Sequence, residues 1–442
     1  MFVLHFKCAL WEGVLTCNSQ IFCISANALD NVKRDRIFMT DFTFHNVGQG
    51  LFYSGRIEDF NFIYDCGSES KTHIQSVVSD YKRSKLRNSH VDLLVLSHLH
   101  ADHVSGLADL LGDGIAVDAV MLPYLSPMER LMVSLDSNNP PEWLRRFWAD
   151  PISYLVGKGA RKIVLFGNSE ASPPEDVPIE EYFEDREKMD INKLPNDEKL
   201  EEEVRAKERK TVTDLLSQGT LFAKKHHLSL PVKKNWLFRF FNRKPDDLNR
   251  NIFEQCIKAN LPDNDPIDII RDRSKLRTLR TCYHKLAGDF NNTSLVLYHA
   301  PITNRLFRAS QFGFCPCSPF PRISRTSQTP NKLTIHLHNR VGHLLSGDID
   351  FKNNWSEISR HFGHYLSIAD LVLVPHHGSK ENWNQTALNR IANTCCWVIS
   401  AGSNNKYGHP DPSVCQDIAN SGSSFQCVNE GTEISIRSII HF

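Results

Sequence analysis

The sequence predicts a layered α/β fold whose chemically active residues lie in the loops that follow its strands. Two observations carry this prediction. Short apolar runs alternate with stretches of helical spacing, and polar motifs follow nearly every apolar run. At 442 residues, of which 41% are hydrophobic and 23% charged, the chain has the composition of a soluble globular protein with one large or two ordinary domains.

The first half of the chain alternates strand and helix patterns. Strands are expected at 42–44 and 60–64, and the next segment places Ile74, Val77, Val78 and Tyr81 on one face of a helix. The pattern then continues with a strand at 91–96, a helix at 104–111, a strand at 120–122, a helix at 143–156 and a strand at 162–166. In the second half, strands are expected at 294–298, at 333–337 and 343–345 as a hairpin, and at 371–374 and 397–400.

The composition shifts near Ser169. Residues 175–209 are densely acidic, which predicts a solvated helix or a partly disordered segment, and a basic and aromatic stretch follows from 224 to 243. The sandwich pattern resumes only near residue 289. We therefore divide the chain into a leader at 1–38, the first half of the fold at 39–169, a charged insertion at 170–285 and the second half of the fold at 286–442.

Charge and cysteine content exclude some classes of partner. Fifty-one basic residues balance fifty-one acidic ones, so no global field favours nucleic acid or membrane. The chain has no apolar run of about 18 residues, the length that would predict a membrane span. Its 12 cysteines are scattered without a Cys-x-x-Cys pair, which favours a reducing compartment and a cytoplasmic location. Glu12 interrupts the apolar part of the leader, so we expect residues 1–38 to be dispensable or a mis-assigned start.

The run at 91–96 leads into a concentrated set of metal ligands. His98, His100, Asp102 and His103 occupy six residues. In an extended segment His98 and His100 point to the same side, whereas Asp102 and His103 come where the chain turns and can face a second point. Imidazole and carboxylate are ligands of zinc and similar ions, so this pattern predicts two metals.

The His-x-His-x-Asp-His pattern resembles the signature of the metallo-β-lactamase fold, an αββα sandwich with metals at its strand ends. Further motifs narrow the resemblance to the hydrolase domain of the ComEC competence proteins and their soluble relatives. These motifs lie, in the family's order, at 45–50, 64–67, 291–294, 346–348, 375–379 and 405–410. The resemblance covers 40–170 and 286–442, and the membrane channel of the competence proteins has no counterpart in this chain.

The resemblance implies a site with two divalent ions. Gly347 lets the chain turn after a strand and project Asp348, whose carboxylate can bridge two cations. Because neighbouring side chains of an extended segment face opposite ways, the resemblance favours His376 as the second metal's ligand, with His377 packing or contacting substrate. Asp65 is expected to orient the histidine loop. The first metal lacks a third histidine, which leaves zinc and manganese both open.

The expected reaction is hydrolysis by a hydroxide held between the metals. Asp102 holds the metals, His409 protonates the leaving oxygen or grips phosphate, and Lys380 and Lys406 contact an anion. Asn292 and Ser294 replace the histidine that many enzymes of this fold carry, and we assign them to substrate binding. Leu51 stands where the family usually has an acidic residue, so a charge role at that position is not expected.

The leading functional hypothesis is a phosphodiesterase that cleaves nucleic acid, DNA above all, by analogy with ComEC-like domains. Local support comes from residues 233–244, where aromatic and basic side chains are interleaved as in a strand-binding surface; the alternative is an amphipathic element packed on the sandwich. A second basic stretch contains Arg271, Arg273, Lys275, Arg277 and Arg280. Two rival hypotheses are a small-molecule phosphodiesterase or lactonase with the insertion as a lid, and a nuclease effector of a bacterial anti-phage system whose partner proteins dock on 170–285.

Overall fold

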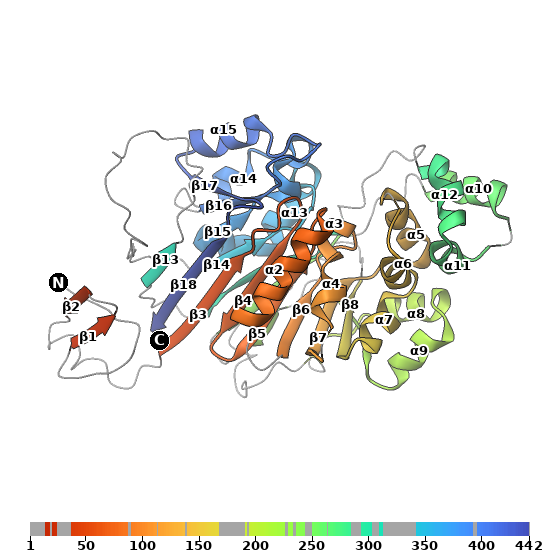
Figure 1. The fold of residues 1–442 in the computed structure, drawn as a ribbon, viewed down its shortest axis with the longest axis horizontal. Coiled ribbons are helices and arrows are strands. Elements are labelled where there is room, and N and C mark those ends of the chain that lie inside the picture. The colour runs from red at the N-terminus through yellow and green to blue at the C-terminus, as the bar shows by residue number, and fades with distance from the viewer. Residues whose placement is uncertain are drawn as a thin grey trace.

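A computed structural model shows two β-sheets packed face to face between layers of helices (Figure 1). It describes residues 14–17, 20–23, 37–86, 90–112, 114–137, 139–167, 191, 194–225, 229–232, 236–243, 250–262, 264–283, 293–302, 309–312, 342–391 and 396–441. Of 14–17, 20–23, 37–38, 250–252, 281–283, 309–312 and 438–441, only the backbone is described. The arrangement is the expected αββα sandwich.

The larger sheet has nine strands and is antiparallel from β13 to β5 and parallel from β5 to β9. In spatial order its strands are β13 (Ala309–Phe312), β18 (Ile434–His441), β3 (Ile37–Phe44), β4 (Phe52–Ile57), β5 (Phe60–Cys66), β6 (His90–Val95), β7 (Ala116–Pro123), β8 (Ala160–Phe166) and β9 (Leu221–Lys224). Since β3 begins at Ile37 and pairs with β18 along its whole length, the sandwich starts two residues before the expected boundary at Met39.

The second sheet has seven strands, antiparallel from β10 to β14 and parallel from β14 to β17. They are, in order, β10 (Ser229–Val232), β11 (Trp236–Phe241), β12 (Val296–Pro301), β14 (Gly342–Leu345), β15 (Ala369–Leu373), β16 (Cys396–Ser400) and β17 (Ser424–Val428). A separate hairpin pairs β1 (Val14–Cys17) with β2 (Gln20–Cys23). The expected strand at 333–337 lies outside the described residues.

Helices cover the outer faces of both sheets. On and beside the nine-stranded sheet lie α2 (Lys71–Ser84), α3 (Ala101–Val104), α4 (Leu107–Leu110), α5 (Pro127–Asp136), α6 (Glu142–Ala149), α7 (Pro151–Gly157), α8 (Glu198–Lys207), α9 (Lys210–Ser217), α10 (Arg250–Asn260), α11 (Pro266–Arg271) and α12 (Arg273–Tyr283). On the seven-stranded sheet lie α13 (Phe351–Phe362), α14 (Ala387–Arg390), α15 (Pro412–Asn420) and the 3-10 turns η6 (Gly363–Ile368), η7 (Pro375–Gly378) and η8 (Lys380–Asn382).

The predicted amphipathic face of α2 is confirmed, because Ile74, Val77, Val78 and Tyr81 are all buried against the nine-stranded sheet. Two predicted helices differ from the expectation. In place of the first, expected at 104–111, the structure has α3, which ends at Val104, and α4, which covers Leu107–Leu110. The second is divided at Asp150, whose side chain accepts a hydrogen bond from Ser153 N–H and so starts a new helix.

The stretch expected to bind nucleic acid is instead part of the core. Residues 236–241 form β11, an inner strand of the seven-stranded sheet, and Trp236, Phe238, Phe240 and Phe241 are all at most 5% exposed. These aromatic rings cannot stack on bases, so the alternative interpretation of an element packed on the sandwich is the correct one. Lys233, Lys234 and Lys244 lie outside the described residues.

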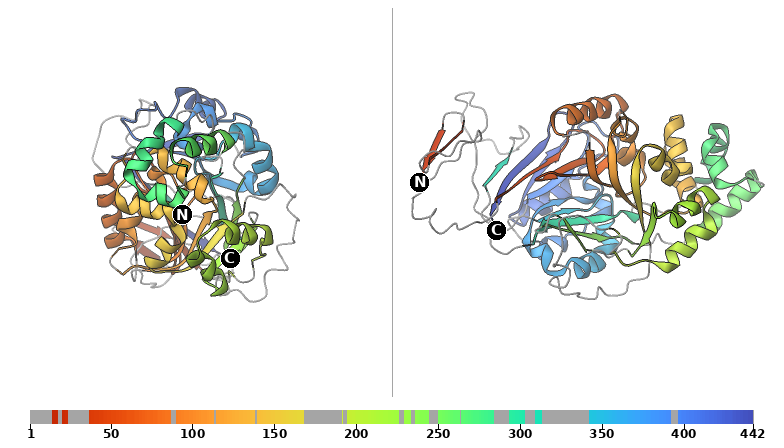
Figure 2. Two further views of the ribbon diagram at one scale, coloured as in Figure 1. Left: turned by 90° about the vertical axis from the view of Figure 1, so that its right-hand side faces the viewer. Right: turned by 90° about the horizontal axis from the view of Figure 1, so that it is seen from below.

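The segment 170–285 is therefore not wholly an insertion. It supplies β9 to the larger sheet and β10 and β11 to the smaller one. Its acidic part includes the expected helix, α8, and its other helices gather with α5 and α6 at the end of the sandwich remote from β13 (Figure 2). A buried ion pair inside this group joins α5 to the residue that follows α8, with Arg130 Nη1 2.7 Å from Glu208 Oε1 and both side chains 1% exposed.

A chain of hydrogen bonds joins the two sheets inside the core. Trp236 Nε1–H donates to His299 Nδ1 at 3.3 Å, so the single N–H proton of the neutral ring is on Nε2, which donates to Tyr53 Oη at 2.9 Å. The Tyr53 hydroxyl then donates to His343 Nδ1 at 2.8 Å. Burial lowers the pKa of His299 to about 3, which keeps that ring neutral. His299 is thus a satisfied core residue; His284 lies outside the described residues.

Two further expectations concern cysteines and membranes. Cys66, Cys396, Cys415 and Cys427 are free thiols, but Cys256 in α10 is disulfide-bonded, whereas the scattered cysteines were expected to fit a reducing compartment better than a disulfide framework. Within the described part of the chain, no helix has the length and apolar character needed to cross a membrane.

Candidate metal centre

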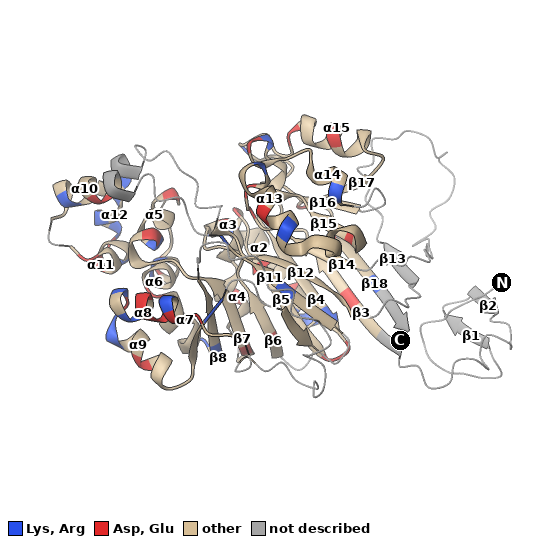
Figure 3. Ribbon diagram, turned by 180° about the vertical axis from the view of Figure 1, so that it is seen from behind, with Lys and Arg blue, Asp and Glu red and all other residues tan. Residues whose placement is uncertain are grey.

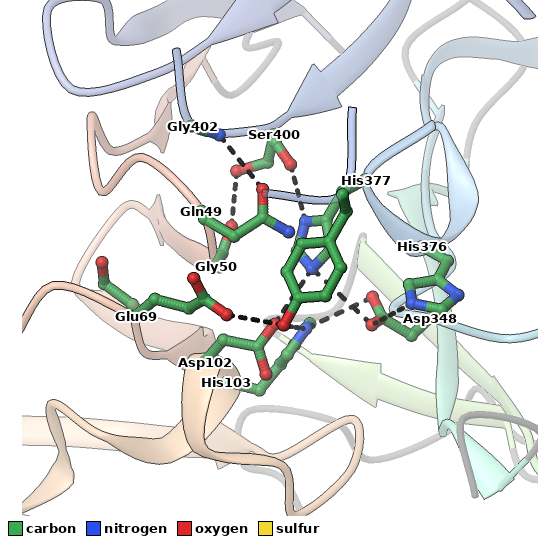
Figure 4. A network of polar contacts seen from close by, with 12 residues as sticks. Gln49, Gly50, Glu69, Asp102, His103, Asp348, His376, His377, Ser400 and Gly402 are labelled. Carbon is green, nitrogen blue, oxygen red and sulfur yellow. Dashed lines mark hydrogen bonds and ion pairs between the residues drawn. The ribbon is translucent and has the colours of Figure 1, made fainter. Parts of the chain in front are cut away.

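The expected metal ligands meet at one end of the sandwich, on loops that follow β6, β14 and β15 (Figure 4). The ligand atoms of Asp102, His103, Asp348 and His377 all lie within 4.8 Å of one another. Residues from both halves of the chain thus form one group, because the two sheets bring their strand ends to the same edge of the sandwich.

Asp65 fixes the orientation of two histidines. Its carboxylate accepts hydrogen bonds from Ser97 N–H at 2.6 Å, from the Ser97 hydroxyl at 2.5 Å and from His103 Nδ1–H at 2.8 Å. Because the Ser97 hydroxyl donates to Asp65, its oxygen accepts from His98 Nδ1–H, 2.9 Å away. Both rings therefore keep Nε2 for coordination, and neither buried Nε2 has a hydrogen-bond partner among the described residues.

Asp65 is itself completely buried and adopts a left-handed φ of 56°. Burial raises the pKa of its carboxyl, although His103 and Ser97 oppose the shift. The structure thus places Asp65 behind the ligands, in the supporting position that the resemblance implies, where it determines which ring nitrogen each histidine offers.

His377, rather than His376, belongs to the four-residue group. Its Nδ1–H donates to the Ser400 carbonyl at 2.7 Å, and its Nε2 lies 3.1 Å from Asp102 Oδ2 and 3.6 Å from Asp348 Oδ2. His376 is more exposed, and its Nε2 lies 3.8 Å from Asp348 Oδ2. The assignment from sequence assumed an extended segment, but His376 and His377 have φ of 47° and 55°, so they do not alternate between two faces.

His376 nevertheless stays close enough to bind beside Asp348. Its Nδ1 is hydrogen-bonded to Asn382 Oδ1 at 2.7 Å, which again leaves Nε2 for coordination. Four histidines, His98, His103, His376 and His377, thus have Nδ1 bound to the protein and Nε2 within 3.8 Å of an Asp348 oxygen.

Asp348 occupies the centre of the site. One carboxylate oxygen lies 3.2 Å from His103 Nε2, and the other lies near His98, His376 and His377. Gly347 before it has φ of 55°, and a Cβ there would come within 2.9 Å of the Ser97 side chain. Glycine is therefore required both for the turn and for the close approach of the two ligand loops.

The charges of the residues around the site favour binding of a cation. Burial alone would raise the pKa of Asp348, but His103, His377 and His376 outweigh burial and hold it well below its usual value. Burial likewise disfavours protonation of His103, yet the carboxylates of Asp348, Asp102 and Asp65 raise its pKa. The carboxylates of Asp348 and Asp102, whose pKa values are both lowered, are therefore ionised at neutral pH, and the imidazole protons between them occupy positions that a divalent ion can take instead.

An open cleft leads to this group. His100, Lys406 and His409 line it together with Asp102, Asp348, His376 and His377. The His100 ring lies 5.0 Å from the His98 ring. Burial, with the neighbouring His376 and His377, lowers the pKa of His409 to about 4. His409 is thus a neutral imidazole at pH 7, able to accept a hydrogen bond from a substrate.

Two other expected site residues, Ser294 and Lys380, lie away from the cleft. Ser294 is buried behind the ligands, where its hydroxyl accepts from Asp348 N–H at 3.2 Å and lies 3.4 Å from His98 Nδ1, so it supports the site and does not face the cleft. Lys380 is exposed on η8 and is not part of the cleft wall. Asn292 lies outside the described residues.

Several supporting residues were not foreseen from the sequence. Gln49 Oε1 accepts from Gly402 N–H at 3.2 Å, and the Ser400 hydroxyl donates to the Gly50 carbonyl at 2.7 Å, so the 45–50 motif holds the loop that fixes His377 (Figure 4). Tyr407 forms the cleft rim, and its hydroxyl donates to Glu69 Oε1 at 2.8 Å. Ser400 ends β16 and Ser97 follows the end of β6 by two residues, and this position after a strand is the one sequence signal that could have indicated them.

The residues present suit divalent metals. Buried imidazole nitrogens without hydrogen-bond partners, next to two ionised carboxylates, form the mixed nitrogen and oxygen donor set that zinc and similar ions favour. Asp102, His103, Asp348 and His377 would hold one ion. Asp348 together with His98 and His376 lies beside that group and offers donors for another.

Comparison with known proteins agrees with this fold and site. The family model of the metallo-beta-lactamase superfamily matches residues 47–209, which include the His98–His103 loop. No curated protein matches the chain. The matched segment, the two-sheet sandwich and the converging histidines and aspartates lead to one conclusion: the chain carries a metallo-beta-lactamase superfamily domain with a candidate metal site, as expected for a metal-dependent hydrolase.

Proposed function

We infer that the protein is a metal-dependent phosphodiesterase that cleaves DNA. The observation that carries this proposal is the shared geometry of His98, His103, His376 and His377, each with Nδ1 bound to the protein and Nε2 turned toward Asp348. Divalent ions bound there supply activated water and neutralise charge on the attacked oxygen. The nitrogen-rich donor set favours zinc over manganese.

The chain's own residues supply the remaining parts of the reaction. His409 faces the cleft beside His376, with ring centroids 5.8 Å apart, and positions a substrate oxygen next to the ligands. Tyr407 stacks along His409 and, with its hydroxyl held by Glu69, keeps the loop 405–410 against the cleft. DNA as the substrate rests on the resemblance to ComEC-like hydrolase domains.

A small-molecule phosphodiesterase or lactonase is the second candidate. One observation favours it, namely that the cleft wall carries more carboxylates than cations, so the wall itself does not attract a polyanion. Under this hypothesis the helices α5 and α6 at the end of the cleft limit the size of the substrate.

Cleavage assays with purified protein test the proposal. Linear and circular DNA, RNA and a small diester are each incubated with zinc or with manganese, alongside the variants Asp102→Ala and Asp348→Asn. We expect DNA cleavage by the unmodified protein, loss of cleavage in both variants and less bound metal in elemental analysis. Turnover of the small diester without any cleavage of polymers would select the second candidate.

A further inference from the structure

The cleft itself offers little attraction for a long polyanion. Among the described residues that line it, Glu69, Asp102, Asp109, Asp136 and Asp348 are acidic, and the lysines are Lys71 and Lys406. Lys406 is already engaged, because its Nζ lies 3.5 Å from Glu69 Oε1. Bound metals would offset Asp102 and Asp348, but the rest of a polynucleotide needs cations elsewhere on the surface.

Helix α12 provides such cations on one face. Arg273, Arg277 and Arg280 are spaced i, i+4 and i+7 and therefore lie along the same side of the helix. Residues 271–280 hold five basic side chains and one acidic side chain, and α12 packs through the buried Leu276 and Leu279 on the adjoining side of the helix, next to Arg280. Figure 3 colours the basic residues of this helical group blue.

Two of the three arginines of this face, Arg273 and Arg277, are available to a ligand. Arg273 and Arg277 are exposed, and neither guanidinium makes a hydrogen bond or ion pair within the described part of the chain. The neighbouring carboxylates are engaged in other contacts. Asp272 accepts hydrogen bonds from Ser274 and Lys275 N–H at the start of α12, and Asp268 pairs with Arg209 at 2.8 Å.

The same helix is attached to the rim of the cleft. Arg280 Nη2 donates to the Ser137 carbonyl at 2.6 Å, and Ser137 lines the cleft. Arg145 connects the same rim to the end of α11, the helix before α12, since Nη1 donates to the Pro140 carbonyl at 2.7 Å and Nε donates to the Arg271 carbonyl at 3.3 Å. Ser137 and Pro140, which both line the cleft, are thus joined to α12 directly and to α11 through Arg145.

We propose that the face of α12 formed by Arg273, Arg277 and Arg280 binds the phosphate backbone of a polynucleotide whose cleaved segment lies in the metal cleft. This proposal rests on the proposed phosphodiesterase function and adds to it a second contact region outside the catalytic group. The α12 face would supply the cations that a polymer needs on a protein with no net charge and an acidic cleft wall. It takes the nucleic-acid-binding role first expected of the stretch that contains residues 236–241, which are buried in the core.

The test compares a double variant, Arg273→Gln with Arg277→Gln, with a matched control, Arg360→Gln with Arg390→Gln. The control removes two exposed charges from α13 and α14, which contribute no residue to the cleft wall. Affinity is measured by fluorescence anisotropy with labelled single-stranded and duplex DNA of about 30 nucleotides, in EDTA, across a range of salt. Cleavage of the same DNA and of the dinucleotide TpT is measured with metal.

Each phosphate contact contributes a slope of about −0.7 in single strands or −0.9 in duplex to log affinity against log salt. Loss of two contacts should therefore flatten the slope by about 1.4 to 1.8 and weaken binding about tenfold or more near 0.1 M salt. We expect this change in the α12 variant and not in the control. Turnover of TpT should be unchanged in both, because the metal ligands are intact.

The possible results separate the two proposals. DNA cleavage by the unmodified protein, with equal affinity and salt slope in the α12 variant and the control, would overturn the binding face and leave the phosphodiesterase in place. DNA binding that depends on α12 without cleavage of any diester would support the face and overturn the proposed reaction. If the unmodified protein neither binds nor cleaves DNA, both are wrong.

Discussion

His377→Ala and His376→Ala should have different effects on metal binding, although the two residues are neighbours. His377 Nε2 lies 3.1 Å from Asp102 Oδ2, its Nδ1 is held by the Ser400 carbonyl, and its side chain is 4% exposed. The His376 side chain is 24% exposed, and its Nε2 lies 3.8 Å from Asp348 Oδ2. His377 is thus one of four residues that surround a single point, whereas His376 stands beside it.

The expected magnitude follows from the number of ligands. A four-ligand zinc site contributes roughly 10–16 kcal/mol of binding free energy, so one ligand accounts for about 3–4 kcal/mol. His377→Ala should therefore weaken the tighter bound metal by about two to three orders of magnitude. His376→Ala should leave that ion bound within about tenfold of the unmodified protein and weaken only a second, looser ion.

Competition with a chromophoric chelator measures both affinities, and thermal melts in EDTA check that each variant is folded. Hydrolysis of a small diester should fall in both variants. If His376→Ala loses the tighter ion while His377→Ala retains it, the ligand assignment from the structure is wrong and the assignment from the sequence is right.

Three further substitutions test the surroundings of the site and the core. Asp65→Asn should reduce metal affinity about 10- to 100-fold, since the amide cannot accept from Ser97 and His103 as the carboxylate does; unchanged chelator titrations would contradict this role. Glu208→Gln leaves the buried Arg130 charge unpaired and should lower the free energy of unfolding in urea by about 3–5 kcal/mol. A loss below about 1 kcal/mol would show that the backbone carbonyls bound to Arg130 are enough to hold its charge. The pKa of His299 is lowered to about 3 by burial, so the unfolded chain gains a proton below pH ~6.5 that the folded chain does not take up until pH ~3. Because of this residue, the free energy of unfolding should fall by about 1.4 kcal/mol for each unit by which the pH decreases across that window. His299→Gln should therefore lower the slope of unfolding free energy against pH by about 1.4 kcal/mol per unit. Equal slopes in the variant and the unmodified protein would refute a neutral, buried His299.

The sequence by itself determined the fold class and indicated most of the candidate metal ligands. Strand and helix patterns are local, and His98, His100, Asp102 and His103 follow a strand directly, so spacing alone places them at a sheet edge. The motif order also led to Asp65 and Asp348, whose positions in the structure agree with the roles that the resemblance implies.

Only the tertiary structure decided the points that depend on contacts between distant segments. The turn at His376 and His377 is left-handed, and no local pattern predicts that, so the sequence did not indicate that His377 joins the four-residue group while His376 lies beside it. Residues 236–241 have the composition of a nucleic-acid surface, yet pairing with β12 and packing against the facing sheet bury their rings. Ser294 was assigned to substrate for the same reason: whether a side chain faces the cleft or the back of the site depends on how the two sheets meet, which spacing along the chain does not specify.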